Sequence, residues 1–328
     1  MKPFSNPNLT PDNVMQSVYC AADAIMEVYN QKEIESETKL DDSPVTIADI
    51  NAHNILSETL SKSGWPILSE EGEHADFEIR KMWDLFWVVD PLDGTKEFIK
   101  GNGEFTINVA LVKGHTPIWG VVHSPVLDWT YVGGPDSGSY KSKGKLSYND
   151  IISQGQVLPK KLPEKLTVIA SRSHGSHATE KLLKKWEKEH GEMNRISMGS
   201  SLKICLVAEG VAHAYPRAAL TMEWDTAAGH AIAIGSNCHI LKMEELNEQL
   251  IWSSPLVYNK QNLLNPFFIV CGSEDLCKDA LHRNSFEIQA CFYCSIFGSS
   301  WIFIGNARIY FKSVYSFGFR RVCDCRIE

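Results

Sequence analysis

The sequence predicts a layered fold in two regions, an N-terminal α+β region and a smaller C-terminal α/β region. In the first region, two helical patterns precede a series of short apolar runs separated by Gly, Asn or Pro, which is typical of a sheet covered by helices. In the second region, short strand and helix patterns alternate, which is typical of an α/β unit. The length of 328 residues agrees with about two domains.

Two amphipathic helices are expected at the start of the chain. Thr10 is a good N-cap, a proline occupies the first helical position, and apolar residues follow at helical spacing to about residue 32. A polar stretch broken by Pro44 separates this helix from a second one, which begins near Thr46 and ends near Gly64. Asp49 falls in the first turn of the second helix, where a favourable interaction with the helix dipole would by itself explain an acidic side chain.

Short strands, and then alternating strands and helices, are expected further along the chain. The first set of strands is Pro66–Leu68, Leu85–Val89, Phe105–Val112, Ile118–His123 and Trp129–Val132. Residues 137–165 are rich in Ser, Gly, Lys and Pro, and we expect a hairpin rim followed by a linker. The second set has strands at Leu166–Ala170, Asn194–Met198, Val211–Tyr215 and His239–Leu241, and helices at His177–His190, Ser201–Glu209 and Asp225–Ile234.

The composition restricts the classes of partner. The net charge is −8, and an acidic surface argues against nucleic acid as a partner. The N-terminus lacks a basic segment followed by an apolar core, so no secretory signal is expected and the nine cysteines are expected to be thiols in a reducing cytosol. The expected location is therefore cytoplasmic. Peripheral contact with the cytoplasmic face of the inner membrane and the oligomeric state stay open.

The strongest chemical signal is WVVDPLDGTKEF at residues 87–98. An apolar strand delivers Asp90 at its end, and Gly94 permits a tight bend. Asp90 and Asp93 can then converge on one point with the Leu92 carbonyl between them, and such oxygen ligands suit a hard divalent cation such as magnesium. A simple turn is the alternative, because Asp, Pro and Gly are common turn formers.

Two further acidic segments follow the same pattern. In LSEEGE, Glu70 and Glu71 end a short apolar run, and adjacent carboxylates repel unless they are solvated or neutralised by a cation. In MEWDTAAGHAI, Asp225 precedes a run of small residues, where it would act either as an N-cap or as a ligand. All these acidic residues lie at strand ends or helix starts, where sites gather in layered folds.

The order of these motifs resembles the inositol monophosphatase superfamily of lithium-sensitive, magnesium-dependent phosphatases. The segments SPVTIADINAH, VVDPLDGTKEFIKGNGEFTINVALV, ASRSH, GSSLKICLVAEG and EWDTAAGHA are similar to the bacterial 3′(2′),5′-bisphosphate nucleotidases of this superfamily. The resemblance covers roughly residues 10–272. It implies the layered αβαβα sugar-phosphatase fold with two subdomains.

The resemblance also implies the cofactor and the residues that bind it. A site for about two or three Mg²⁺ ions is implied, in which metal ions activate water and stabilise the leaving oxygen without a covalent enzyme intermediate. Thr95 and Asp49 are implied to orient the attacking water. The implied metal ligands are Glu70, Asp90, the Leu92 carbonyl, Asp93 and Asp225.

The implied substrate is a small nucleotide, 3′-phosphoadenosine 5′-phosphate. Its hydrolysis to AMP and phosphate would clear a by-product of sulfate activation. From the residues alone, a solvated helix lysine and a loop histidine would explain Lys203 and His174, although Lys203 and Arg217 carry charges that suit a phosphate. The implied substrate contacts are Gly94, Thr95, His174, Ser200, Lys203, Arg217 and Asp225.

The sequence departs from the family pattern after Arg217. Ala218, Ala219 and Leu220 stand where the family usually has an aromatic or aliphatic residue followed by Gly-Pro, and this changes the allowed backbone conformations. Two alternatives stay open: an inositol or sugar phosphatase with the same metal core, and an inactive homologue acting as a binding protein. The ASRSH and GSSLK segments favour the nucleotide.

The family pattern ends near residue 272, and the remaining segment has a different composition. It is rich in Phe, Tyr and Cys, and we interpret it as an extension from a shifted reading frame or a lost stop codon. Its uncharged run at Ile288–Ala307 is too polar for a good membrane span. Cys291 and Cys294 could bind zinc together with Cys323 and Cys325, but the second pair has the wrong spacing for a usual zinc site. The expected division is a metal-binding subdomain at 1–160, a substrate subdomain at 161–272, and an atypical tail at 273–328 outside the fold.

Overall fold

The computed structural model of the protein describes residues 8–31, 37–38, 44–170, 177–246, 249–272, 300–304, 307–315 and 321–327. The chain divides into two compact units, Met1–Leu276 and Cys277–Glu328. The helices of the first unit are α1 (Pro11–Tyr29), α2 (Ile47–Leu60), α3 (Phe77–Arg80), α4 (Thr95–Ile99), α5 (Tyr148–Gln154), α6 (His177–His190), α7 (Leu202–Glu209) and α8 (Ala227–Gly235), with a 3₁₀ turn at Ser61–Ser63. Its strands are β1 (Glu37–Thr38), β2 (Pro44–Val45), β3 (Ile67–Ser69), β4 (Leu85–Asp93), β5 (Thr106–Lys113), β6 (Thr116–Ser124), β7 (Trp129–Gly134), β8 (Gly138–Lys143), β9 (Gln156–Leu158), β10 (Thr167–Ile169), β11 (Asn194–Ile196), β12 (Ala214–Arg217), β13 (His239–Leu246), β14 (Gln249–Pro255) and β15 (Phe268–Cys271).

A seven-stranded sheet in the order β3-β4-β5-β6-β7-β8-β9 forms the first layer of strands. The β3–β4 pair is parallel and the remaining pairs are antiparallel. α1 and α2 cover one face, where Ile25 and Leu56 share a buried apolar cluster with Trp87 and Val109. Alternate residues of the same strands, such as Val88, face the opposite side, as expected for a sheet buried on both faces.

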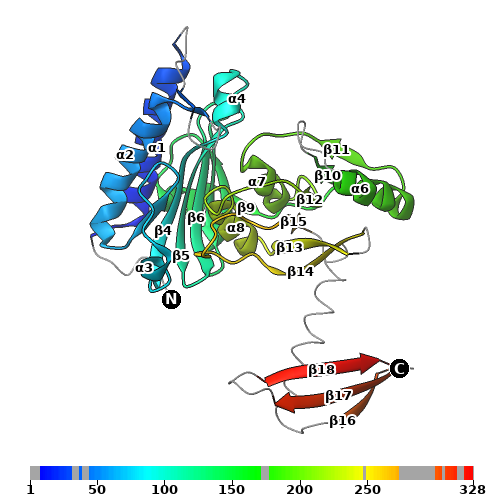
Figure 1. Cartoon of the computed structure of the whole chain (residues 1–328). Helices are drawn as coiled ribbons and strands as arrows, with labels where there is room; N and C mark the ends of the chain where they lie inside the picture. Colours follow the sequence, from blue (N-terminus) through cyan, green and yellow to red (C-terminus); the bar gives the residue numbers. More distant parts are fainter. Residues whose placement is uncertain are drawn as a thin grey trace. The chain divides into compact units, whose positions relative to one another are not determined.

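α7 and α8 lie between this sheet and a second one (Figure 1). The second sheet has six strands in the order β11-β10-β12-β15-β13-β14, of which β10 pairs in parallel with β11 and β12 and the rest pair antiparallel. α8 packs very closely on β6: a Cβ at Gly120 would lie 2.5 Å from the Ala228 carbonyl oxygen, so only glycine fits there. On the second sheet, Trp186 of α6 contacts Trp252 of β14 with ring centroids 6.3 Å apart.

The start of α2 is fixed by side-chain caps that also hold a candidate catalytic residue. Thr46 is the N-cap, and its hydroxyl accepts a hydrogen bond from the Ala48 N–H at 3.2 Å. Asp49 accepts from the Thr46 N–H at 2.8 Å, which completes a capping box. The first-turn position expected for Asp49 is therefore what the structure shows, with the carboxylate held in place by the backbone of its own helix.

The layered fold expected from the sequence is confirmed, with local differences. Residues 137–165 contain more regular structure than a hairpin rim and a linker, because β8, α5 and β9 lie there. α5 has seven residues and buries only Ile151, so it is too short to show a helical period in the sequence. The strand expected at Val211–Tyr215 is shifted to Ala214–Arg217, and the last helix begins at Ala227 instead of Asp225.

The second unit contains an antiparallel sheet in the order β16-β17-β18, formed by Ser300–Ile304, Ala307–Tyr315 and Arg321–Ile327. Residues 273–299 lie outside the described part of the chain. They include Cys291, Cys294 and most of the uncharged run noted above. Among the helices that the structure does describe, none combines the length and the apolar character needed to cross a membrane.

Candidate active site

The end of β4 forms a sharp turn that carries two of the predicted ligands. The pairing of β4 with β5 shifts register between Asp90 and Asp93, so the strand leaves regular pairing within the DPLD segment. Gly94 follows with a φ of 97°, a left-handed conformation that favours glycine, and α4 begins at Thr95. The turn keeps both aspartates at the same end of the strand.

Three carboxylates from three separate segments converge at this end of the sheet. One oxygen each of Glu70, Asp90 and Asp225 lies within 4.8 Å of the others. Burial, followed by the charges of Glu70 and Asp93, raises the pKa of Asp90 well above its usual range. Burial and the charge of Asp93 likewise raise the pKa of Asp225. Without a cation the cluster is therefore electrostatically unfavourable.

These residues fit a divalent cation. Asp90 Oδ1 accepts a hydrogen bond from the Leu92 N–H at 3.1 Å, but Asp90 Oδ2 is buried and has no hydrogen-bond partner among the residues the structure describes. An unpaired buried carboxylate oxygen is costly unless a positive charge neutralises it. An all-oxygen set of donors is what Mg²⁺ prefers in proteins.

Asp93 connects the first sheet to α7. Asp93 Oδ2 accepts hydrogen bonds from the Ser201 N–H at 2.6 Å and from the Ser201 hydroxyl at 2.7 Å. The same hydroxyl lies 2.7 Å from the Asp225 carbonyl oxygen. Asp93, at the end of β4 in the first sheet, is thus held by the N-cap residue of α7.

Asp49 and Thr95 meet beside the carboxylate cluster. The Thr95 hydroxyl lies 3.2 Å from Asp49 Oδ1 and 3.3 Å from the Leu92 carbonyl oxygen. Asp49 Oδ2 accepts from the Thr46 hydroxyl at 2.6 Å, and burial raises the pKa of Asp49. When the hydroxyl of Thr95 donates to Asp49, its lone pairs remain available to a water molecule. The predicted pairing of these two residues agrees with this geometry.

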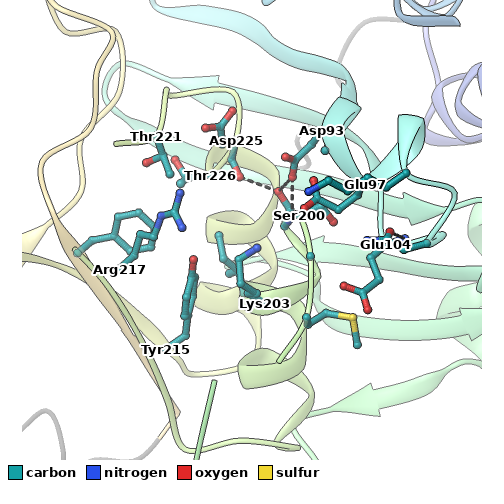
Figure 2. Close-up of a pocket in the computed structure, with 18 residues that line it drawn as sticks. Asp93, Glu97, Glu104, Ser200, Lys203, Tyr215, Arg217, Thr221, Asp225 and Thr226 are labelled. Carbon is teal, nitrogen blue, oxygen red and sulfur yellow. Dashed lines mark hydrogen bonds between the residues drawn. The ribbon is translucent and has the colours of Figure 1, made fainter. Parts of the chain in front are cut away.

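A cavity of about 350 Å³ adjoins the carboxylates. Figure 2 shows Arg217 and Tyr215 on one side of it and Glu97 and Glu104 on the other, with Lys203 between them. Asp93 and Asp225 also line the cavity, so one space is bounded by the candidate cation site and by three basic residues, Lys100, Lys203 and Arg217.

Lys203 is a largely buried cation without an acidic partner in contact. Its ammonium lies 5.9 Å from the centre of the Tyr215 ring, and it forms no salt bridge with any acidic side chain that the structure describes. Burial lowers the pKa of Lys203 to about 8. Arg217 donates to the Leu220 carbonyl oxygen at 3.2 Å, while its buried Nε has no partner among the described residues. Both side chains are suited to an anion that enters the cavity.

Most of the predicted substrate contacts surround this cavity. Gly94, Ser200, Lys203, Arg217 and Asp225 line it, whereas His174 lies outside the described residues. The unusual residues after Arg217 leave its side chain at the cavity, and Leu220 is exposed.

Sequence reasoning missed several residues that line or support the site. Glu97, Glu104 and Tyr215 line the cavity, and Ser201 contacts a candidate ligand directly. Ser201 is the second serine of the GSSLK segment, from which only Ser200 was predicted to be functional. The segment was therefore the right signal, but its two serines could not be told apart without the structure.

The fold and the site define a cation-dependent enzyme that acts on phosphorylated small molecules. The chain belongs to the inositol monophosphatase family, whose pattern matches residues 12–268. It is 46% identical over 232 residues to the 3′(2′),5′-bisphosphate nucleotidase CysQ of Salmonella typhimurium, a match that covers 70% of this chain and 89% of the relative. It is 41% identical over 263 residues to the CysQ nucleotidase of Escherichia coli strain K12, covering 79% of this chain and 98% of the relative.

A solved structure supports the same assignment. The crystal structure of CysQ from Bacteroides thetaiotaomicron, described as a bacterial member of the inositol monophosphatase family, is 40% identical and superposes with a TM-score of 0.72. The match covers 83% of this chain and 99% of that one. The family resemblance inferred from the sequence motifs is confirmed.

Proposed function

We propose that the protein is a magnesium-dependent 3′(2′),5′-bisphosphate nucleotidase that hydrolyses 3′-phosphoadenosine 5′-phosphate to AMP and phosphate. One observation carries the proposal: the cavity that adjoins the carboxylate cluster contains the largely buried Lys203 ammonium, which has no salt bridge in the described part of the chain, together with Arg217. The CysQ relatives carry the same activity in their names.

The two charged regions of the site match a substrate with two phosphates. The phosphate to be removed belongs at the carboxylate cluster, which becomes attractive to it once a cation is bound. The retained phosphate belongs at Lys203 and Arg217, where charge-assisted hydrogen bonds would hold it. A substrate with a single phosphate, such as an inositol monophosphate, would leave one of these regions without an anion.

The residues of the chain itself supply orientation and electrostatics. Glu70, Asp90 and Asp225, whose carboxylate oxygens converge, would hold the cation together with Asp93, which lines the adjoining cavity beside Asp225. Thr95, which donates to Asp49, would accept a hydrogen bond from the attacking water and fix its position. Ser200 would contact the nucleotide, because it lines the same cavity.

The cofactor is Mg²⁺, as in the magnesium-dependent phosphatases of this family. Bound Mg²⁺ supplies Lewis-acid chemistry, which lowers the pKa of water and stabilises the leaving oxygen. The count of about two or three ions stays a prediction. So do the cytoplasmic location, the peripheral contact with the inner membrane, and the division of residues 1–272 at residue 160.

Phosphate release from two substrates tests the proposal. Purified protein is incubated with 3′-phosphoadenosine 5′-phosphate or with inositol 1-phosphate, each with Mg²⁺, with EDTA and with added lithium. We expect release from the nucleotide that requires Mg²⁺ and falls with lithium, and little release from the inositol substrate. Release mainly from inositol 1-phosphate would keep the metal site and refute the nucleotide assignment. No release from either substrate by folded protein would instead favour an inactive homologue.

A further inference from the structure

Ser201, the serine of the GSSLK segment that was not predicted to be functional, connects two candidate metal ligands. It is 3% exposed and lies at the N-cap of α7. Its N–H and hydroxyl lie 2.6 Å and 2.7 Å from Asp93 Oδ2, and the hydroxyl also lies 2.7 Å from the Asp225 carbonyl oxygen. One small side chain therefore contacts the last residue of β4 and the loop before α8.

The hydrogen bonds of the Ser201 hydroxyl can be assigned by counting donors and acceptors. A hydroxyl has one proton and two lone pairs. The Asn108 side-chain amide donates into one lone pair at 2.8 Å, so the proton is shared between Asp93 Oδ2 and the Asp225 carbonyl oxygen. Thr106 and Asn108 add long contacts of 3.4 Å to the same Asp93 oxygen. Every hydrogen bond given to the Asp93 carboxylate by these residues goes to Oδ2.

This arrangement decides which way the Asp93 carboxylate faces. Because Oδ2 is saturated by donors from Ser201, Oδ1 is the oxygen left for another ligand. Asp93 also lines the cavity beside Asp225. Oδ1 is therefore the oxygen that Asp93 can offer to a cation there. Loss of a residue that orients a metal ligand typically weakens metal binding about 10- to 100-fold.

We propose that Ser201 is a positioning residue of the cation site. Its hydroxyl fixes the rotation of the Asp93 carboxylate and ties the loop that carries Asp225 to it. α7 begins at the next residue and carries Lys203, the lysine proposed to bind the retained phosphate. The same hydroxyl therefore also connects this helix to the candidate metal ligands. The inference rests on the proposed function in one respect, namely that Asp93 and Asp225 bind a divalent cation.

The test measures Mn²⁺ affinity directly, by titration followed by electron paramagnetic resonance of free Mn²⁺. Ser201→Ala removes the hydroxyl but keeps the N–H bond to Asp93. We expect it to weaken Mn²⁺ binding about 10- to 100-fold, the range seen when a residue that orients a metal ligand is lost. Ser201→Thr keeps the hydroxyl and should restore most of the affinity. Ser139→Ala is the matched control, because Ser139 is also buried and its hydroxyl donates to the Ile232 carbonyl oxygen, away from the carboxylates.

The outcomes separate this inference from the proposed function. If wild-type protein does not bind Mn²⁺, the cation site itself is refuted. If wild-type and Ser201→Ala proteins bind Mn²⁺ equally, only the positioning role is refuted. Equal weakening in Ser201→Ala and Ser139→Ala would also refute it, because a general loss of a buried hydroxyl would then explain the effect. Should Ser201→Ala fail to fold, Asn108→Ala removes the donor on the other side of the same hydroxyl, and unchanged Mn²⁺ affinity in that variant would refute the role.

Discussion

Replacing Lys203 by methionine should make the free protein more stable and its binding of AMP weaker. Methionine has a similar length and no charge, so the substitution removes the ammonium with little loss of packing. Burial is the main reason why the pKa of Lys203 falls from 10.5 to about 8. At 1.36 kcal/mol for each pKa unit, this depression corresponds to about 3 kcal/mol of destabilisation by the charged form near neutral pH.

The pH dependence of this effect has a definite sign. The folded-state pKa of Lys203 is the lower one, so between about pH 8 and pH 10.5 the unfolded chain binds more protons than the folded chain. The unfavourable contribution is therefore fully present below pH 8 and disappears as the pH rises to 10.5. Lys203→Met should add up to about 3 kcal/mol to the free energy of unfolding at pH 7 and little at pH 10.5.

The loss of AMP affinity follows from the same charge. Hydrogen bonds to charged groups contribute about 1.5–3 kcal/mol, so Lys203→Met should weaken AMP binding roughly 10- to 100-fold. Urea unfolding in EDTA at both pH values gives the stability, and isothermal titration calorimetry with Mg²⁺ gives the affinity for AMP. A variant with wild-type stability and wild-type AMP affinity would refute the reasoning, because it would show that Lys203 is solvated and not part of the phosphate site.

Three other variants test separate parts of the structure. Thr95→Val should lower kcat about 100-fold or more with little change in KM, whereas Thr95→Ser should retain activity; equal rates in steady-state assays of the two variants would contradict the role of the hydroxyl. Asp90→Asn should remove the rise in melting temperature that Mg²⁺ gives to the wild-type protein, and a Mg²⁺ shift of wild-type size in thermal melts would argue against Asp90 as a ligand. Burial lowers the pKa of His123 to about 4, so between about pH 6.5 and pH 4 the unfolded chain binds more protons than the folded chain. Urea unfolding should therefore show that the free energy of unfolding decreases by about 3 kcal/mol as the pH is lowered from 6.5 to 4. In His123→Gln this fall should be smaller, and an equal fall in both proteins would assign it to other groups.

The part of the site that could be predicted from the sequence is the part built from contiguous residues. Asp90, Asp93 and Gly94 lie within one strand end and its turn, so spacing and the conformational freedom of glycine were enough to place the two carboxylates at the same end of β4. Asp49 could be placed for the same reason, since its position depends on the first turn of a single helix.

The remaining features depend on contacts between distant segments. Ser201 and Asp93 are 108 residues apart, and no local pattern shows that the start of α7 meets the turn after β4. The cavity residues Glu97, in α4, and Tyr215, in β12 of the second sheet, also come from distant segments, so only the folded arrangement brings them to one space. α5 escaped prediction for another reason: a seven-residue helix offers two turns at most, which is too few for its periodicity to stand out.

The hydrogen bonds between Ser201 and Asp93 have a consequence for when the cation site can form during protein synthesis. A ribosome adds about 5–20 residues per second, so roughly 5 to 20 seconds separate the synthesis of Asp93 from that of Ser201, 108 residues later. During that interval the nascent chain already contains Glu70, Asp90 and Asp93 but lacks both Asp225 and the serine that orients Asp93. Cellular Mg²⁺ should therefore bind the growing chain only weakly. Its stabilising effect should begin only when the second sheet has been synthesised and has packed, through α7 and α8, against the first.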